Sequence, residues 1–229
     1  MDRPSQHTSI SNKNPRRAFI SNEKSTTPKR SGSCVLGQYN TWYSMNKILV
    51  VGDSFSEDMS SESWVTQLGY SVTNLSRCGI SEYKIYQRIK NIDFSQFSFC
   101  IINHTSPNRI YMPKNPYYVN DSKYQHCDLL YSDIKSREPD EFATNVSWWF
   151  ENVFDLEQAE FMHNLLIDYI IQSTPSNTLH MTFFPSKNTH LVGLQSIWKK
   201  HPGAINHLDK VGNQLVTKSI KEYLSLDIK

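Results

Sequence analysis

The chain has 229 residues, 38% of them hydrophobic and 12% aromatic, and a formal net charge of +2 at pH 7. This length suits one α/β domain with a tail, or at most two small domains, and no apolar run approaches the roughly 18–20 residues that a membrane helix needs. The charge is uneven, because residues 1–45 hold seven Lys/Arg and two Asp/Glu whereas residues 46–229 hold seventeen and twenty. The part after residue 45 therefore lacks the broad basic surface typical of nucleic-acid binding.

Residues 1–45 are rich in Ser, Thr, Asn, Lys, Arg and Pro and show no hydrophobic periodicity. Such a composition predicts a disordered basic tail, followed by one folded domain over 46–229. The tail has no apolar stretch of the kind found in secretory signals, which favours a cytoplasmic location. Our hypothesis is that residues 1–44 are dispensable and that Met45 is an alternative start. The competing interpretation is a basic tether for an acidic partner.

From residue 47 onward, short apolar runs alternate with amphipathic segments. We expect strands over 47–51, 71–75, 97–102 and 177–184, with a weaker fifth over 189–194. We expect helices over 60–68, 81–92, 156–172 and 209–224. This alternation predicts right-handed crossovers and a mostly parallel sheet of four or five strands covered by helices on both faces, a three-layer α/β/α sandwich of flavodoxin-like type.

Residues 104–150 interrupt this rhythm. They are rich in Pro, Asn, Tyr and Asp and include the cluster Trp148-Trp149-Phe150. An irregular insertion of this length is more typical of a lid or binding segment than of a simple connector. Arg109 and Trp148 are candidate substrate-binding residues, because aromatic faces stack on sugars and Arg binds carboxylates or phosphates. The alternative is that the insertion carries a small aromatic core of its own.

The run Ile48-Leu-Val-Val-Gly52-Asp53-Ser54 places a serine just beyond the first expected strand. Ligands of parallel sheets lie beyond the carboxyl ends of the strands, so Ser54 is expected at the functional edge. Gly52 allows the chain to turn there, and Asp53 can hold the turn through local hydrogen bonds. Serine is a weak nucleophile until a neighbouring base takes its proton, so a base is needed elsewhere in the chain.

A candidate base lies near the other end, in the segment Asn206-His207-Leu208-Asp209-Lys210-Val211-Gly212. Together the two segments resemble the SGNH/GDSL hydrolase family, which has a Gly-Asp-Ser block after the first strand and a final block with His followed five residues later by Gly. The resemblance implies that Ser54 is the nucleophile and His207 the general base. His201 is a rival because His-Pro is frequent in the final block, but its spacing to Gly212 is wrong.

The resemblance also suggests where a developing oxyanion would be bound. The second block of the family supplies a glycine N–H after the second strand, a role that falls on Gly79, and the Ser54 N–H would be a second donor. The third block normally reads Gly-x-Asn-Asp, whereas this chain has Ile102-Asn103-His104-Thr105-Ser106-Pro107-Asn108. Asn103 and Asn108 are both candidates for the third donor, and Thr105 or Ser106 could also donate.

A second departure concerns the residue that orients the imidazole. The family usually has Asp three residues before the catalytic His, and that position here is Ala204. Asn206 is adjacent to His207 but cannot stabilise an imidazolium as a carboxylate does. The expected arrangement is a Ser–His dyad whose ring is held by a backbone carbonyl or by a carboxylate from elsewhere.

The sequence therefore predicts a serine-dependent esterase that hydrolyses or transfers an O-acyl group, on a small-molecule or glycan ester, without metal or organic cofactor. One alternative is an inactive SGNH-fold module that binds glycans or acylated ligands. Another is an assembly protein that docks through its basic tail. The cluster His126-Cys127-Asp128 is a poor metal site because adjacent residues rarely share one ion. The four cysteines have neither metal-knuckle nor redox spacing and are expected to be reduced thiols, at positions 34, 78, 100 and 127.

Overall fold

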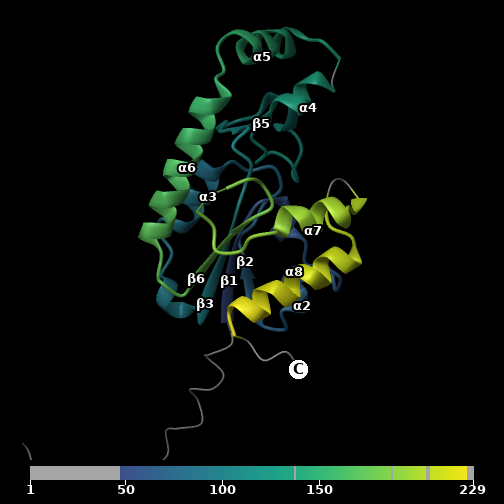
Figure 1. Cartoon of the computed structure of the whole chain (residues 1–229). Helices are drawn as coiled ribbons and strands as arrows, with labels where there is room; N and C mark the ends of the chain where they lie inside the picture. The colour runs from purple at the N-terminus through teal and green to yellow at the C-terminus, as the bar shows by residue number, and fades with distance from the viewer. Residues whose placement is uncertain (1–46, 137, 187, 205–206, 226–229) are drawn as a thin grey trace, which may run out of the picture. The chain divides into compact units, whose positions relative to one another are not determined.

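The computed structural model describes residues 47–225, apart from residues 137, 187, 205 and 206. Its described part contains a parallel four-stranded sheet in the order β2-β1-β3-β6 (Figure 1). The strands are β1 (Lys47–Gly52), β2 (Ser71–Asn74), β3 (Phe99–His104) and β6 (Thr178–Thr182). The predicted α/β class with a parallel sheet is thereby confirmed. The expectations for residues 1–45 concern a segment that lies outside the described residues.

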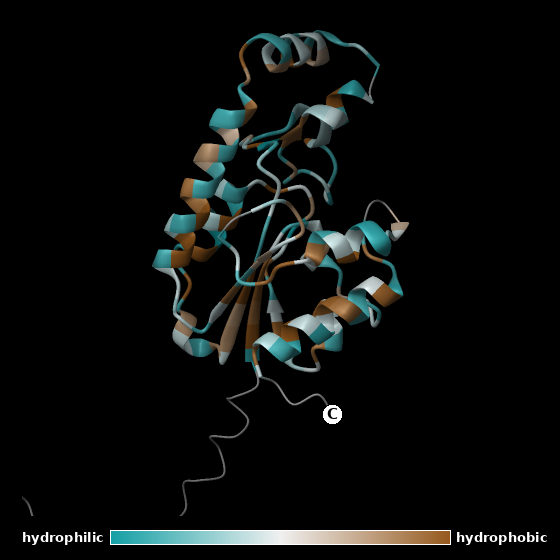
Figure 2. Cartoon of the chain, in the orientation of Figure 1, coloured by the Kyte–Doolittle hydropathy of each residue, from teal (hydrophilic) through white to brown (hydrophobic). Residues whose placement is uncertain are grey.

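Helices pack on both faces of this sheet because the side chains of a strand alternate between faces. Ile48 and Val50 of β1 belong to a core cluster with α2 (Trp64–Gln67), α7 (Leu194–Lys200) and α8 (Lys210–Tyr223). Leu49 and Val51 belong to a second cluster with α3 (Glu82–Ile89) and α6 (Leu156–Ser173). All four of these β1 residues are fully buried, and the strands are correspondingly hydrophobic in Figure 2.

Three local expectations differ from the structure. The segment 189–194 is not a strand, since Leu191 makes only an isolated bridge with Met181 before Gly193, at φ +87°, leads into α7. Helix α7 itself was not predicted. The helix expected over 60–68 begins only at Trp64, because the Ser63 hydroxyl accepts a hydrogen bond from the Thr66 N–H at 3.3 Å and caps it.

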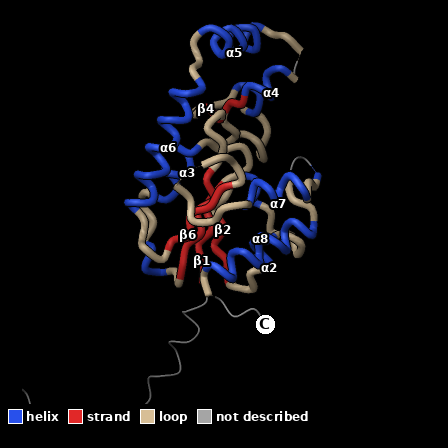
Figure 3. The backbone as a smooth tube through the Cα atoms, in the orientation of Figure 1, coloured by secondary structure: helices blue, strands red, loops and turns tan. Residues whose placement is uncertain are grey.

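The insertion expected to be irregular holds short elements and a core of its own. It contains the antiparallel pair β4 (Arg109–Ile110) and β5 (Leu129–Leu130), followed by α4 (Tyr131–Lys135) and α5 (Glu141–Asn152). Strand β5 leads directly into α4 (Figure 3). A third hydrophobic cluster, separate from the two beside the sheet, packs these elements together around Leu129, Ile134, Ala143 and Phe150. The alternative expectation of a small aromatic core therefore describes this segment.

Two sets of short elements complete the described chain. Helix α1 (Ser54–Glu57) follows β1 directly, and 3₁₀ turns lie at Phe94–Gln96 and Pro116–Tyr118. In the part of the chain that the structure covers, no helix is both long and apolar enough to cross a membrane.

Candidate active site

Ser54 is the first residue of α1 and lies at the carboxyl end of β1. The chain turns there in close contact with β3, since a Cβ on Gly52 would stand 2.7 Å from the Asn103 carbonyl oxygen. Asp53 is the N-cap, and its Oδ1 accepts a hydrogen bond from the Phe55 N–H at 3.0 Å. Ser54 is half-buried, and neither its N–H nor its Oγ has a hydrogen-bond partner among the described residues. Within the described part of the chain, both groups therefore remain free to contact a ligand.

Asp53 is buried and receives two further hydrogen bonds from the end of β3. The Asn103 Nδ2 donates to Oδ1 at 2.9 Å and the Thr105 hydroxyl donates to Oδ2 at 3.1 Å. Burial raises the pKa of Asp53 to about 6, although the nearby Arg109 and the hydrogen bonds from the Phe55 N–H and the Thr105 hydroxyl favour the ionised form. Asn103 and Thr105, two of the expected ligand-facing donors, thus each donate a side-chain hydrogen bond to the carboxyl group that caps the Ser54 turn.

Gly79 lies beside this turn because the segment after β2 continues along the end of β1. The Arg77 N–H donates to the Gly52 carbonyl at 3.0 Å, and the Cys78 N–H donates to the Glu57 Oε2 of α1 at 2.9 Å. Gly79 is buried at φ +70°, a backbone conformation that favours glycine. Its carbonyl accepts from Arg109, but its N–H has no partner in the described part of the chain.

His207 comes from the loop between α7 and α8 and reaches the same helix. Its ring centroid lies 5.5 Å from that of Phe55, the residue after Ser54. Burial lowers the pKa of His207, while the acidic side chains of Asp58 and Glu57 act in the opposite direction. Neither ring nitrogen of His207 has a hydrogen-bond partner among the described residues. Asn206, which was considered as a residue that could support the ring, lies outside the described residues. The structure thus brings His207 to α1 without a hydrogen bond to Ser54.

His201, the rival candidate for the base, has a carboxylate partner in Asp209. His201 Nδ1 lies 3.6 Å from the Oδ2 of Asp209. Asp209 is itself the N-cap of α8, and its Oδ1 accepts a hydrogen bond from the Gly212 N–H at 2.6 Å. This geometry favours His207 over His201 as the base near Ser54.

The predicted substrate-binding residues Arg109 and Trp148 and the predicted oxyanion donor Asn108 lie around three different cavities. Arg109 lines a cavity of about 490 Å³, whereas the exposed Asn108 lines a second of about 350 Å³ beside β5 and α5. Trp148 is 60% exposed and lines a third, between α4 and α5. Of these three residues, only Arg109 forms a hydrogen bond to a residue beside the Ser54 turn, because its Nη1 donates to the Gly79 carbonyl at 3.1 Å.

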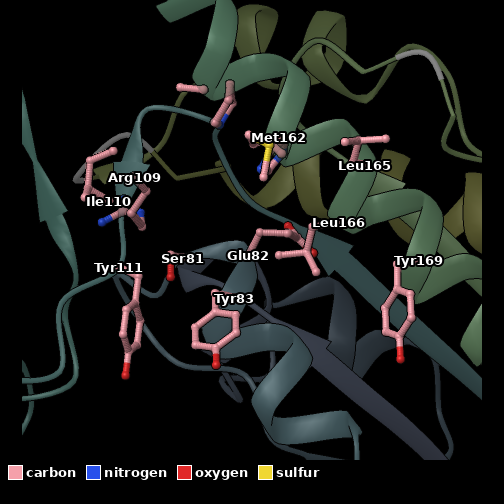
Figure 4. Close-up of a pocket in the computed structure, with 13 residues that line it drawn as sticks. Ser81, Glu82, Tyr83, Arg109, Ile110, Tyr111, Met162, Leu165, Leu166 and Tyr169 are labelled. Carbon is pink, nitrogen blue, oxygen red and sulfur yellow. The ribbon is translucent and has the colours of Figure 1, made fainter. Parts of the chain in front are cut away.

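The cavity lined by Arg109 is the largest of these three and lies between α3, α6 and β4 (Figure 4). Its wall is largely aromatic and aliphatic. Besides Arg109 and the tyrosines, the titratable residues in this wall are Glu82 and His163. Sequence reasoning missed both residues, because neither belongs to a recognisable motif. The lining tyrosines are Tyr83, Tyr111 and Tyr169.

Glu82 begins a buried chain of hydrogen bonds that crosses the end of the sheet. Its Oε1 lies 2.7 Å from His104 Nδ1, and His104 Nε2 lies 3.0 Å from His180 Nδ1. The other ring nitrogen of His180 lies 3.0 Å from the Thr174 hydroxyl. Burial opposes the ionised form of Glu82, yet His104 beside it holds the pKa of this carboxyl below its usual range. The chain therefore joins α3, β3 and β6 through polar side chains in the protein interior.

His180 makes the stability of the fold depend on pH. Burial, with His104 and His190 nearby, lowers the pKa of His180 to about 3. An unfolded histidine titrates near 6.5, so below that pH the unfolded chain binds a proton that the folded chain does not. We expect His180 to remove about 2 kcal/mol from the free energy of unfolding between pH 7 and pH 5. Between pH 7 and pH 5, the free energy of unfolding of His180→Gln, measured with urea, should fall by about 2 kcal/mol less than that of the wild type.

Asp53 acts in the opposite direction, because its raised pKa makes the folded chain bind a proton as pH falls through 6. It is present in both proteins and cancels in the comparison. The matched control is His126→Gln on an exposed side chain, which should follow the wild type. Equal losses for His180→Gln and the wild type would contradict the assignment.

Among the described residues, no group of three or more His, Cys, Asp or Glu side chains is placed to hold a metal ion. Asp128, from the weak metal motif, instead accepts hydrogen bonds from the Ser81 and Met112 N–H groups and an ion pair from Lys84. Comparison with known proteins identified no matching family model, curated protein or solved structure.

Proposed function

We propose that the protein is a serine-dependent esterase, built on a three-layer α/β/α domain of the SGNH/GDSL type, that hydrolyses or transfers an O-acyl group. The observation that carries this proposal is the convergence of three elements at the carboxyl edge of the sheet. Ser54 lies at the start of α1, Gly79 lies beside it, and His207 packs against the same helix; within the described part of the chain, the Ser54 hydroxyl and the Gly79 N–H have no hydrogen-bond partner. These are the components of acyl transfer through a serine ester.

In the proposed reaction, the Ser54 Oγ attacks the ester carbonyl while His207 accepts the hydroxyl proton. The N–H groups of Ser54 and Gly79 donate to the oxygen that becomes negatively charged, a contribution on the order of 3 kcal/mol per donor. His207 then gives its proton to the departing alcohol, leaving an acyl group on Ser54. Water completes hydrolysis, and a sugar hydroxyl completes transfer.

The electrostatics around His207 support its role as base. Burial lowers its pKa, so the ring is neutral at pH 7 and can accept a proton. The carboxylates of Asp58 and Glu57 favour the protonated ring and so supply part of the charge stabilisation that Ala204 cannot give. The missing hydrogen bond between Ser54 and His207 is compatible with this role, because catalytic hydrogen bonds often tighten only when substrate binds.

The substrate class that we propose is an ester of a small molecule or a glycan, and the proposed chemistry uses no cofactor. Arg109 connects the Gly79 loop to the aromatic cavity, where Tyr83 and Tyr111 are among the lining residues. Such a wall suits the apolar body and scattered hydroxyls of a sugar or an aryl ester.

A fluorophosphonate probe tests the proposal, because it reacts with a serine only when a base activates the hydroxyl. We expect the full-length protein to become labelled on Ser54, as located by peptide mass spectrometry. Ser54→Ala should remain unlabelled, whereas Ser60→Ala, on an exposed loop, should label like the wild type. A folded wild-type protein that does not label would refute the esterase and favour a non-catalytic module that binds its ligand in the same place.

A further inference from the structure

Two cysteines that are 49 positions apart in the sequence meet directly beside Gly79. The Sγ of Cys127 lies 3.4 Å from the carbonyl oxygen of Cys78 and donates a hydrogen bond to it. The two segments are joined next to this contact, since the Asp128 N–H donates to the Gly79 carbonyl at 2.7 Å. The packing is so close that a Cβ on Gly79 would overlap the Cys127 side chain.

From this geometry we propose that Cys78 and Cys127 form a reversible disulfide when the protein meets a hydroperoxide, so that the Gly79 loop is a site of redox modification. The site goes beyond the proposed esterase function and does not require it. A disulfide needs two thiols on adjacent backbone segments whose side chains point toward each other. Cys78 and Cys127 meet this condition through the neighbouring backbone hydrogen bond, the contact of the Cys127 Sγ with the Cys78 carbonyl, and the hydrogen bond between the two thiols.

The two thiols are suited to different steps. The hydrogen bond with the Cys127 thiol lowers the pKa of Cys78, and Arg109 acts in the same direction, whereas burial and Glu57 oppose them. Cys78 is half-exposed, while Cys127 is buried with its pKa raised by its contact with Cys78 and by burial. Since the thiolate is the reactive form, Cys78 is the attacking sulfur and Cys127 the resolving one. By contrast, Cys100 is buried with its pKa raised to about 11.

The reaction balances with hydrogen peroxide as oxidant. The Cys78 sulfur attacks one peroxide oxygen, the O–O bond breaks, and a sulfenic acid forms as the first water leaves. The Cys127 sulfur then attacks the sulfenic sulfur, the S–S bond forms, and the S–O bond breaks to release a second water. Two thiols lose two electrons and two protons, and one peroxide becomes two waters.

The experiment uses full-length protein carrying Cys34→Ser, so that the cysteine outside the described residues takes no part. After stoichiometric hydrogen peroxide, unreacted thiols are alkylated under denaturing conditions and counted by intact mass. We expect the three alkylated thiols of the untreated protein to become one, with dithiothreitol restoring all three. Peptide mapping should find Cys78 linked to Cys127. Three alkylated thiols after treatment, or a link to Cys100, would overturn the proposal.

Cysteine variants distinguish the sulfur that attacks the peroxide from the sulfur that resolves the sulfenic acid, and they do so without an activity assay. Cys127→Ser should trap a sulfenic acid at Cys78 that reacts with dimedone, and Cys78→Ser should give neither disulfide nor adduct. Cys100→Ser is the matched control and should form the disulfide like its parent. A Cys127→Ser protein with no dimedone adduct at Cys78 would overturn the order of steps. The link between positions 78 and 127 should also raise the Tm of the oxidised protein by about 5–10 °C.

The disulfide also bears on the proposed esterase, because Cys78 immediately precedes Gly79 and its N–H donates to Glu57 of α1. If Ser54 is catalytic, oxidation should change ester turnover, and dithiothreitol should reverse the change. The two proposals can fail separately. A disulfide in a protein that does not label with fluorophosphonate refutes only the esterase, whereas labelling without the disulfide refutes only the redox site.

Discussion

His207→Ala is expected to lower kcat for a short aryl ester such as nitrophenyl acetate on the order of a thousandfold. The variant removes the proposed base from beside α1, and general base catalysis contributes about 10²–10⁴-fold. The loss of stability should be small, because the ring is only half-buried and makes no side-chain hydrogen bond among the described residues. Initial rates at pH 7 for variant and wild type, with circular dichroism to verify the fold, provide the measurement.

His201→Ala is the matched control for this prediction. His201 lies at the start of the same loop and is half-buried like His207, but its ring pairs with Asp209. Its variant should turn over substrate at a rate close to that of the wild type. A large loss in His201→Ala together with an active His207→Ala would transfer the role of base to His201.

Gly79→Ala is expected to lower the free energy of unfolding by about 3 kcal/mol. A left-handed backbone costs an alanine about 1–2 kcal/mol, and the φ of Gly79 is +70°. The added Cβ would also overlap Cys127, and overpacking of this kind costs a further 1–3 kcal/mol, roughly. Urea denaturation followed by tryptophan fluorescence gives the value.

Gly69→Ala separates the two causes. Gly69 has a similar φ of +79°, but no atom lies within 4 Å of the position that a Cβ would take. Its variant should therefore show only the backbone cost, about 1 kcal/mol. Equal losses at both positions would mean that the contact with Cys127 contributes nothing, and the close packing described at Gly79 would be incorrect.

The sheet could be predicted from the sequence because the hydrophobic pattern of each strand lies within the strand itself. The strands from Ile48 to Val51 and from Phe99 to Ile102 are continuous apolar runs, and the structure buries them on both sides. The failures are short elements, which contain too few residues for a periodic pattern. Helix α7 has seven residues, and the segment around Leu191 makes one bridge where a strand was expected.

The candidate site was predictable to the extent that its residues follow motifs. Ser54, Gly79 and His207 were assigned through the resemblance of their segments to the SGNH/GDSL blocks, and the structure places all three around α1. A motif gives the identity of a side chain but not its hydrogen-bond partner. Asn103 was expected to face a ligand, but its amide donates to Asp53, 50 positions away.

The buried chain from Glu82 through His104 to His180 shows the same limit more clearly. These side chains are 22 and 76 positions apart in sequence, and nothing local marks them as partners. His180 lies in a fully buried strand, where a histidine gives no sign of the group that it will contact. Only the register of β3 with β6, which pairs Ile102 with His180, brings the two rings together.

The separate core of the insertion has a consequence for motion within the chain. Leu129, Ile134, Ala143 and Phe150 pack with one another and not with the clusters beside the sheet. A unit with its own core can open without exposing the rest of the domain, at a free energy well below that of global unfolding. Backbone amides of α4 and α5 should therefore exchange with solvent through local opening. By contrast, the hydrogen-bonded amides of the buried strands β1 and β3, which lead to the Ser54 turn, should exchange only when the parallel sheet itself comes apart.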